Sequence, residues 1–347
     1  MMNNYFSLKK KIELSRILEL IEVQSNSLSV IKKLDSYHKN ARSHVIGITG
    51  PPGVGKSSLI NNLILTLRKK NFSVGVIAVD PSSMRSGGAL LGDRARFDID
   101  PKDHKVFVRS MAAKDFLGGI AELTYPSTIV MRSIFDVLII ETVGVGQSEV
   151  SIENVVDTVV YCVQPGSGDI LQFMKSGIIE IPDLIVVTKG DLKELSNITL
   201  SDLNQSKSYF NNSSEWDIKI CSVSSHLNTG FDNLRKNLDV RWKWLNKGDD
   251  LLSIRKSQDI KWINKSLKNE YGFSGFTKLQ NFIHYTSEPF KTLEKLKKKN
   301  KYNIKIVSIF HPFRNKGYKL CSITIHKGFR INTKICFINF NYSYCVV

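Results

Sequence analysis

Hydrophobic and polar positions along the chain predict short strands that alternate with amphipathic helices from about residue 44 to about residue 245. The strand-like runs are nearly continuous in Val, Ile and Leu, which is typical of strands buried on both faces of a sheet. Because helical stretches separate most of these runs, the sequence predicts an α/β fold with a doubly wound, mostly parallel sheet. The runs are HVIGIT (44–49), SVGVIAVD (73–80), KVFVRS (105–110), DVLIIE (136–141), TVVYCV (158–163), DLIVVT (183–188) and IKICSV (218–223).

Three further regions flank this sheet-forming part of the chain. Residues 1–43 predict an N-terminal helical extension, because apolar residues recur there at helical spacing. Residues 246–300 predict a C-terminal helical segment, in which the glycines of residues 272–275 interrupt a helix. Residues 301–347 alternate apolar and polar positions as strands do and form a basic tail. The central domain is therefore expected to span residues 44–245.

A phosphate-binding motif follows the first predicted strand. Gly50–Ser57 fits G-x-x-x-x-G-K-[ST], and an amphipathic helix (Leu59–Lys70) is predicted after it. In this strand–loop–helix context, backbone N–H groups and the helix N-terminus face phosphate oxygens. Lys56 is placed to reach the β- and γ-phosphates, and the Ser57 hydroxyl is placed to ligate Mg²⁺. The sequence thus predicts a nucleoside triphosphate site, with expected contacts at Gly50, Pro51, Gly53, Val54, Gly55, Lys56, Ser57 and Ser58.

Carboxylates follow two of the predicted strands where each strand ends. Asp80 ends one strand and Asp93 lies in the loop after it, while Glu141 ends another strand. Oxygen ligands of this kind suit octahedral Mg²⁺, and an acid at the end of a buried strand is the Walker-B arrangement. Asp80 could equally cap a helix, because caps are common at such positions. Gln147, in the loop after Glu141, is a candidate to orient the attacking water or is simply solvated.

The segment TKGD (188–191) is close to the guanine-reading pattern N-K-x-D. In this pattern Asp191 accepts hydrogen bonds from guanine N1–H and the exocyclic amine, and the stem of Lys189 packs along the base. Adenine lacks both donors, so ATP would leave the carboxylate unpaired at a cost of about 1–3 kcal/mol. Thr188 replaces asparagine, and we expect its shorter hydroxyl not to reproduce the two-ended contact of the amide, which lowers GTP affinity but keeps the preference for GTP. The loop after the last strand either supplies two further base contacts, at Ser224 and Ser225, or is a plain turn.

The composition is that of an ordinary globular protein, with 42% hydrophobic and 23% charged residues. The net charge of +17 is concentrated in residues 291–347, which hold 13 Lys and Arg residues against one acidic residue, Glu294. Such a tail attracts polyanions without specificity, so we expect no specific nucleic-acid partner. Apolar runs stay below the roughly 18 residues that a membrane span needs. A cytoplasmic location is expected, because the N-terminus lacks the apolar core of a signal peptide and the five cysteines are dispersed.

Taken together, these motifs resemble one family. They are similar to the MeaB/ArgK-type P-loop GTPases, which serve adenosylcobalamin-dependent methylmalonyl-CoA mutase and related acyl-CoA mutases. The resemblance extends from about residue 8 to about residue 285. The matching segments are GITGPPGVGKSS (47–58), VDPSS (79–83), GGALLGDRAR (87–96), ETVGVGQSE (141–149) and QPGSGDILQFMKSGIIEIPD (164–183).

The resemblance implies a role and a set of site residues. The implied role is that of a chaperone, whose GTP binding and slow hydrolysis gate cofactor loading of the mutase and protect or reactivate it. Residues 166–180 would be a mobile switch that faces the mutase, and the C-terminal helices would form a homodimer. The implied ligands of Mg²⁺ are Ser57, Asp80, Asp93 and Glu141, the implied phosphate contact is Lys56, and the implied base contacts are Lys189 and Asp191.

Two features depart from the family pattern. Pro126 falls inside an expected helix at 119–133, where a proline should kink or split the helix. Residues beyond about 290 lack the helical, Ala-rich ending of the family, which puts dimerisation in question.

Three other functions compete with this interpretation. An ATPase or kinase of lysine, arginine and ornithine transport would use ATP, which Asp191 disfavours. A metallochaperone GTPase needs a metal-collecting site, and the seven histidines and five cysteines form no cluster at ligand spacing. A nucleotide-binding module that has lost its catalytic activity is disfavoured, because the residues expected to be lost first are all present. These are Lys56, Ser57, Asp80, Asp93 and Glu141.

Overall fold

The computed structural model describes residues 8–24, 27–81, 97, 99–100, 102–113, 123–142, 151–166, 181–209, 215–301, 305–310, 318–327 and 330–339. The chain forms two compact units, Met1–Trp262 and Ile263–Val347, which we describe separately.

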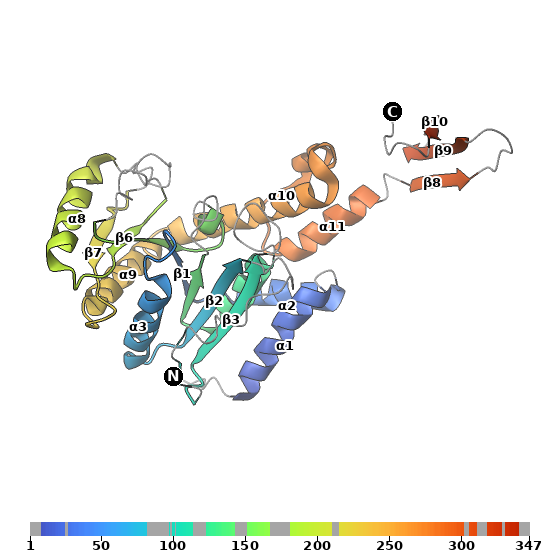
Figure 1. The fold of residues 1–347 in the computed structure, drawn as a ribbon. Coiled ribbons are helices and arrows are strands. Elements are labelled where there is room, and N and C mark those ends of the chain that lie inside the picture. The colour runs from blue at the N-terminus through green and yellow to red at the C-terminus, as the bar shows by residue number, and fades with distance from the viewer. Residues whose placement is uncertain are drawn as a thin grey trace. The chain divides into compact units, whose positions relative to one another are not determined.

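A seven-stranded parallel sheet forms the centre of the first unit, in the order β3-β2-β4-β1-β5-β6-β7 (Figure 1). The first strand in sequence lies in the middle, so the chain winds outward in both directions. The predicted fold class, a doubly wound α/β fold, is confirmed. The strands are β1 (His44–Thr49), β2 (Val74–Pro81), β3 (Val106–Ala113), β4 (Val137–Glu141), β5 (Thr158–Val163), β6 (Leu184–Val187) and β7 (Lys219–Ser222).

Helices cover both faces of this sheet, because successive strand residues point to opposite sides. On one face, Ile46 and Ile48 belong to a core that includes apolar residues of α3 and α9. On the other face, α5 packs on β2 and β4, and α8 packs on β6 and β7. The helices are α3 (Lys56–Lys69), α5 (Thr124–Ile134), α8 (Lys193–Gln205) and α9 (Phe231–Leu245), with short 3₁₀ helices η1 (Ile152–Asn154) and η3 (Ser206–Tyr209).

Pro126 does not interrupt α5, contrary to the expected kink. The helix begins at Thr124, so Pro126 lies in its first turn. Backbone N–H groups of a first turn have no partner within the helix, and a residue without an N–H is therefore tolerated there.

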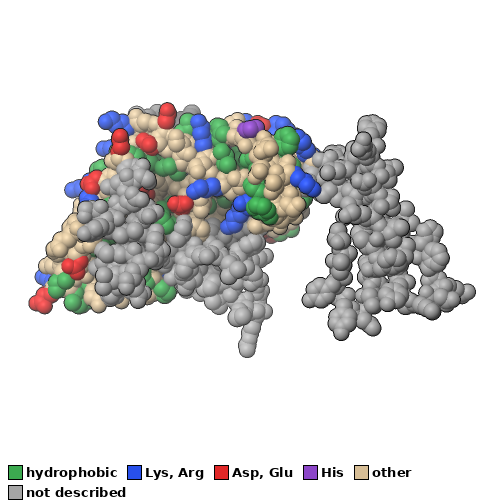
Figure 2. Space-filling view, turned by 90° about the horizontal axis from the view of Figure 1, so that it is seen from above, with side chains coloured by type: hydrophobic (Ala, Val, Ile, Leu, Met, Phe, Trp, Pro, Cys, Tyr) green, Lys and Arg blue, Asp and Glu red, His purple; other side chains and the backbone are tan. Residues whose placement is uncertain are grey.

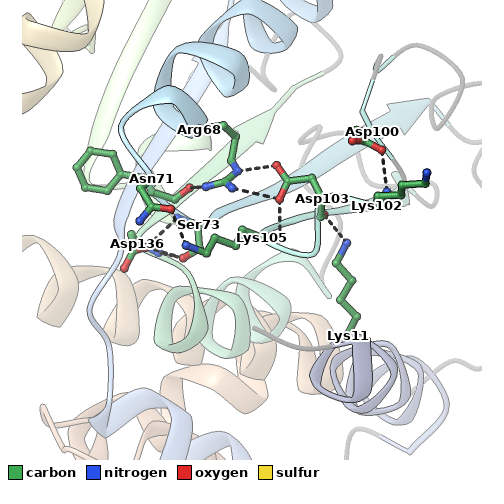
Figure 3. A network of polar contacts seen from close by, with 10 residues as sticks. Lys11, Arg68, Asn71, Ser73, Asp100, Lys102, Asp103, Lys105 and Asp136 are labelled. Atoms are coloured by element: carbon green, nitrogen blue, oxygen red, sulfur yellow. Dashed lines mark hydrogen bonds and ion pairs between the residues drawn. The ribbon is translucent and has the colours of Figure 1, made fainter. Parts of the chain in front are cut away.

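The N-terminal helices α1 (Leu8–Gln24) and α2 (Leu28–Lys39) pack on each other and on α5. Leu14, Leu18 and Ile21 of α1 are fully buried. Polar contacts join α1 to the base of the sheet, because Lys11 Nζ donates to the Asp103 carbonyl at 2.9 Å and Arg68 Nε of α3 donates to the Asp103 carboxylate at 2.7 Å (Figure 3). The N-terminal helices are thus part of the same unit as the parallel sheet.

Three aspartates fasten the amino ends of neighbouring strands. Each lies just before a strand and accepts a hydrogen bond from a backbone N–H at the start of the next strand in the sheet. These bonds fix how the strands are aligned, and so fix where their carboxyl ends lie. The pairs are Asp136 with Ser73 (2.8 Å), Asp157 with Val45 (2.9 Å) and Asp183 with Val159 (2.8 Å).

The second unit starts within α10 (Asp250–Leu279), which is broken at Gly272, where φ is 65° and ψ is −175°. This break confirms the predicted interruption. After η4 (Gln280–Phe282), α11 (Pro289–Lys301) buries Phe290, Leu293 and Leu296. The predicted alternation near the C-terminus forms an antiparallel sheet, in the order β10-β9-β8, from β8 (Lys305–Phe310), β9 (Tyr318–Lys327) and β10 (Arg330–Asn339).

Charges are mixed on the described surface that Figure 2 shows, where Lys and Arg side chains lie among Asp and Glu side chains. This face therefore presents no single sign of charge. Among the helices that the structure describes, none combines the length and the apolarity required to span a bilayer.

Candidate functional site

The phosphate loop joins β1 to α3 at the carboxyl edge of the sheet, as predicted. Gly55 is the N-cap of α3 with φ 99°, a left-handed conformation that side chains with a Cβ rarely adopt. Gly50, with φ 140°, lies directly against β5, since a Cβ there would lie 2.4 Å from the Cys162 carbonyl oxygen. The loop therefore requires glycine at both positions, for backbone conformation and for packing.

Lys56 lies folded across this loop. Its Nζ donates to the Gly50 carbonyl at 2.8 Å and to the Pro51 carbonyl at 2.9 Å, and the side chain is buried. These two carbonyls hold the ammonium at the mouth of the loop. Phosphate oxygens carry negative charge and form stronger hydrogen bonds with an ammonium, so a bound triphosphate would compete with these carbonyls.

Ser57 and Glu141 meet beside the loop. Ser57 Oγ donates to Glu141 Oε1 at 2.8 Å, and the Glu141 side chain is buried at the end of β4. The register brings Glu141 level with Ile48 on β1 and with Ala78 on β2. The backbone of Asp80 lies two residues beyond Ala78, at the carboxyl end of the adjacent strand.

The remaining residues predicted to serve the phosphates lie outside the described residues. These are Asp93, Gln147 and the side chain of Asp80, together with most of the 166–180 segment. Their roles therefore stay predictions.

Thr188 ties the base-reading segment to the phosphate loop. Its hydroxyl oxygen lies 2.7 Å from the carbonyl of Val54 and 3.1 Å from the carbonyl of Val163, and the side chain is buried. The segment after β6 therefore brings the Thr188 hydroxyl close to two carbonyls, one in the phosphate loop and one at the end of β5, and the expected effect of this replacement on GTP affinity stays a prediction. A hydroxyl has one proton and donates to one carbonyl at a time, and Val54 O is the nearer acceptor.

Asp191 and Ser224 connect the two loops that were predicted to hold the base. Ser224 Oγ donates to Asp191 Oδ1 at 2.6 Å, and this hydrogen bond lowers the pKa of the Asp191 carboxyl below its usual value. The Gly190 N–H donates to the Val223 carbonyl at 2.9 Å, so the loops are also joined through the backbone. An ionised carboxylate held in this way suits the two donors of guanine.

Ser225 and Lys189 extend the same region. The Ser225 carbonyl accepts from Asn62 Nδ2 of α3 at 3.4 Å, which links the base loop to the helix after the phosphate loop. Lys189 has a left-handed backbone (φ 52°), and its Nζ donates to Gln164 Oε1 at 2.8 Å. Gln164 follows β5 and begins the matching segment at 164–183, but that motif assigns it no role, so the sequence did not identify this contact.

A second unpredicted contact lies behind the phosphate loop. Thr142 Oγ1 donates to Thr49 Oγ1 at 2.9 Å, and the Thr142 N–H donates to the Ile48 carbonyl at 3.2 Å. These bonds join the start of the loop after Glu141 to the end of β1. Cys162 lies buried below, and burial raises the pKa of its thiol to about 12, so it is no nucleophile.

This geometry defines a P-loop nucleotide-binding protein, with a strand-end carboxylate on the P-loop serine and a base-reading loop on the same edge of the sheet. Comparison with protein families matches residues 14–274 to the family described as methylmalonyl Co-A mutase-associated GTPase MeaB. The protein belongs to this family of P-loop GTPases, which confirms the resemblance drawn from the motifs.

Individual relatives agree with this assignment. A relative from Pyrococcus abyssi is 44% identical over 192 residues, which are 55% of this chain and 58% of the relative. The Escherichia coli protein named GTPase ArgK is 31% identical over 229 residues, 65% of this chain and 69% of that protein. The crystal structure of an LAO/AO transport system kinase has the same fold, with a TM-score of 0.60 at 21% identity, and the match covers 86% of this chain and 100% of that one. The chain therefore spans little more than half the length of the Pyrococcus relative.

Proposed function

We propose that this protein is a Mg²⁺-dependent, GTP-binding and GTP-hydrolysing chaperone of an adenosylcobalamin-dependent acyl-CoA mutase of the methylmalonyl-CoA mutase type. The observation that carries the proposal is the match of residues 14–274 to a family described by its association with that mutase. In this proposal, GTP binding and hydrolysis gate cofactor loading of the mutase and protect it.

The residues at the phosphate loop fit a magnesium ion. The Ser57 hydroxyl and the Glu141 carboxylate are in contact, and both offer the oxygen ligands that Mg²⁺ prefers. We expect Ser57 and Glu141 to hold the ion with Asp80 and Asp93. When bound, the ion would neutralise charge on the β- and γ-phosphates.

The chain's own residues then divide the remaining work. Lys56 gives up its hydrogen bonds to the loop carbonyls and donates to phosphate oxygens instead. Asp191 and Lys189 select guanine over adenine. Gln147 orients the attacking water in this proposal. An arginine supplied by a partner is worth about 10³–10⁵ in rate, so turnover without one should be slow.

The partner-facing parts are also proposals. Residues 166–180 would act as the switch that faces the mutase, and residues 246–300 would form a homodimer. The switch would begin close to the base site, because Gln164 holds Lys189 there. A change in this segment on mutase binding could therefore affect how the nucleotide is held.

Hydrolysis in the presence of a partner tests this function. We expect GTP turnover to rise severalfold when an adenosylcobalamin-dependent mutase is added, and the purified protein to retain that mutase in a pull-down. Lys56→Ala, which cannot hold the phosphates, serves as the control for contaminating GTPase. The absence of an effect from any such mutase would count against the chaperone role.

A further inference from the structure

The backbone of Lys189, a predicted base contact, is held in place on both sides of the residue. Its φ of 52° is left-handed, a conformation that residues with a Cβ adopt only at a cost. Just before it, the Thr188 N–H donates to the Val163 carbonyl at 2.8 Å. Just after it, the Gly190 N–H donates to the Val223 carbonyl at 2.9 Å. The point from which the Lys189 side chain leaves the backbone is therefore fixed.

Gln164 accepts the end of this side chain, next to the carboxyl end of β5. Lys189 Nζ donates to Gln164 Oε1 at 2.8 Å. An ammonium only donates hydrogen bonds, so this contact also sets the amide with its oxygen towards Lys189. Gln164 lies between the buried residues Val163 and Pro165, which limits how far its own backbone can move. Gln164 thus presents an acceptor at a set position beside the base loop.

The same ammonium lies near a second acceptor, the Asp191 carboxylate. Lys189 precedes Asp191 by two residues, and its charge helps to lower the pKa of this carboxyl, to which the hydrogen bond from Ser224 contributes most. Ser224 Oγ donates to Asp191 Oδ1 at 2.6 Å, which leaves further acceptor positions on the carboxylate for the guanine donors. An ammonium bound at those positions would form a charge-assisted hydrogen bond there and compete with guanine.

We propose that Gln164 is a specificity-determining residue for the guanine base, because it holds the Lys189 ammonium away from the Asp191 carboxylate. This inference rests on the proposed base-reading role of Asp191. Without the Gln164 acceptor, the ammonium pairs with the carboxylate, and GTP has to displace it in order to bind. Adenine lacks the donors that Asp191 accepts from guanine, so ATP binding does not depend on where the ammonium lies. Gln164 therefore acts on the ratio of the two affinities.

Gln164→Leu tests the proposal, since leucine keeps a side chain of similar size and has no acceptor. In titrations with GTP and with ATP, each with Mg²⁺, we expect the Kd for GTP to rise about threefold to fivefold, because an exposed ion pair then has to be broken. The Kd for ATP should stay close to the wild-type value. Effects on the phosphate loop or on the metal act on both nucleotides and cancel in the ratio of the two Kd values.

Two further variants at the same position accompany it. Gln164→Glu restores an acceptor for the ammonium and should keep at least the wild-type preference for GTP. Gln164→Ala also lacks the acceptor, and it takes the place of the leucine variant if that variant does not fold.

A second substitution shows whether Gln164 acts through Lys189. Lys189→Met removes the ammonium, so adding Gln164→Leu to it should leave the ratio of the two Kd values where Lys189→Met puts it. A wild-type ratio in Gln164→Leu would overturn the proposal, as would equal weakening of both nucleotides or the same change in the Lys189→Met background. A wild type that binds GTP and ATP equally would instead refute the proposed base reading by Asp191, on which this inference depends.

Discussion

Ser57 Oγ donates a hydrogen bond of 2.8 Å to Glu141 Oε1, although 84 residues separate the two in the chain. The parallel pairing of β1 and β4 produces this contact, because it brings the carboxyl ends of both strands to one edge of the sheet. The hydroxyl and the carboxylate are both magnesium ligands by type, so the pair marks where the metal would bind.

Removing the serine hydroxyl should reduce the magnesium dependence of nucleotide binding. In Ser57→Ala we expect the tightening of GTP binding by Mg²⁺ to shrink by about tenfold, since a contact to a charged group is lost. Titration with a fluorescent GTP analogue, with Mg²⁺ and with excess EDTA, measures this. Ser36→Ala, at an exposed serine of α2 outside the site, should behave as the wild type. An unchanged response to Mg²⁺ in Ser57→Ala would show that the ion binds elsewhere.

The contact between Thr188 and Val54 makes a second prediction. Thr188→Val keeps the shape of the side chain but leaves the Val54 carbonyl without this donor, which costs about 1–3 kcal/mol when the group is buried. Because Val54 belongs to the phosphate loop, we expect the Kd for GTP to rise at least about fivefold. Thr188→Ser keeps the hydroxyl and should bind GTP much as the wild type does. Equal affinities for all three proteins would show that the tether has no part in binding.

His44 should make stability depend on pH. Burial lowers the pKa of this histidine to about 4, and its ring stacks on Trp242 with centroids 4.7 Å apart. The folded pKa lies below the unfolded value of 6.5, so the contribution is complete above pH 6.5 and is lost as the pH falls towards 4. Over that range the free energy of unfolding should decrease by about 3 kcal/mol from this group.

Urea unfolding between pH 4 and pH 7 measures this dependence. His44→Phe keeps a stacked ring and cannot titrate, so its stability should change less with pH in that window. The variant should also be less stable at pH 7, since Thr158 Oγ1 loses the partner that lies 2.7 Å away. An unchanged pH profile in the variant would assign the dependence to other groups.

Two cysteines should resist modification while the protein is folded. Cys162 and Cys221 are free and buried, and burial raises the pKa of their thiols to about 12 and about 11. Thiolates are the reactive form, so iodoacetamide at pH 8 should leave both unmodified on the timescale that labels an exposed cysteine. Peptide mapping by mass spectrometry reads out each site, with protein in denaturant as the control. Rapid labelling of Cys162 would show that the strand beneath the phosphate loop opens readily.

Much of the fold could be predicted because its signals are local. Runs of Val, Ile and Leu locate each strand of the parallel sheet, and the glycines of the phosphate loop locate its turn. Glu141 and Asp191 could also be predicted as site residues, because Glu141 ends a predicted strand and Asp191 lies shortly after the end of another. These predictions needed only the alternation of elements and the rule that ligands gather at strand carboxyl ends.

The contacts that the sequence did not reveal are long-range. Thr188 reaches Val54 because only β5 lies between β1 and β6 in the sheet, and no local pattern reports that order. Gln258 of α10 donates to the Val156 carbonyl from 102 residues away in the chain, and a buried glutamine on a helix resembles a solvated one in sequence. Pro126 was expected to break a helix, because the sequence does not reveal that α5 begins two residues before it.

The central claim is that this protein holds Mg²⁺–GTP between the phosphate loop and the base loop. Equilibrium titration of the purified protein with GTP and with ATP, each with Mg²⁺, tests it most directly, with Lys56→Ala as the non-binding control. We predict that GTP binds at least about tenfold more tightly than ATP, since adenine leaves Asp191 unpaired. Equal binding of ATP and GTP, or binding that survives Lys56→Ala unchanged, would contradict the account.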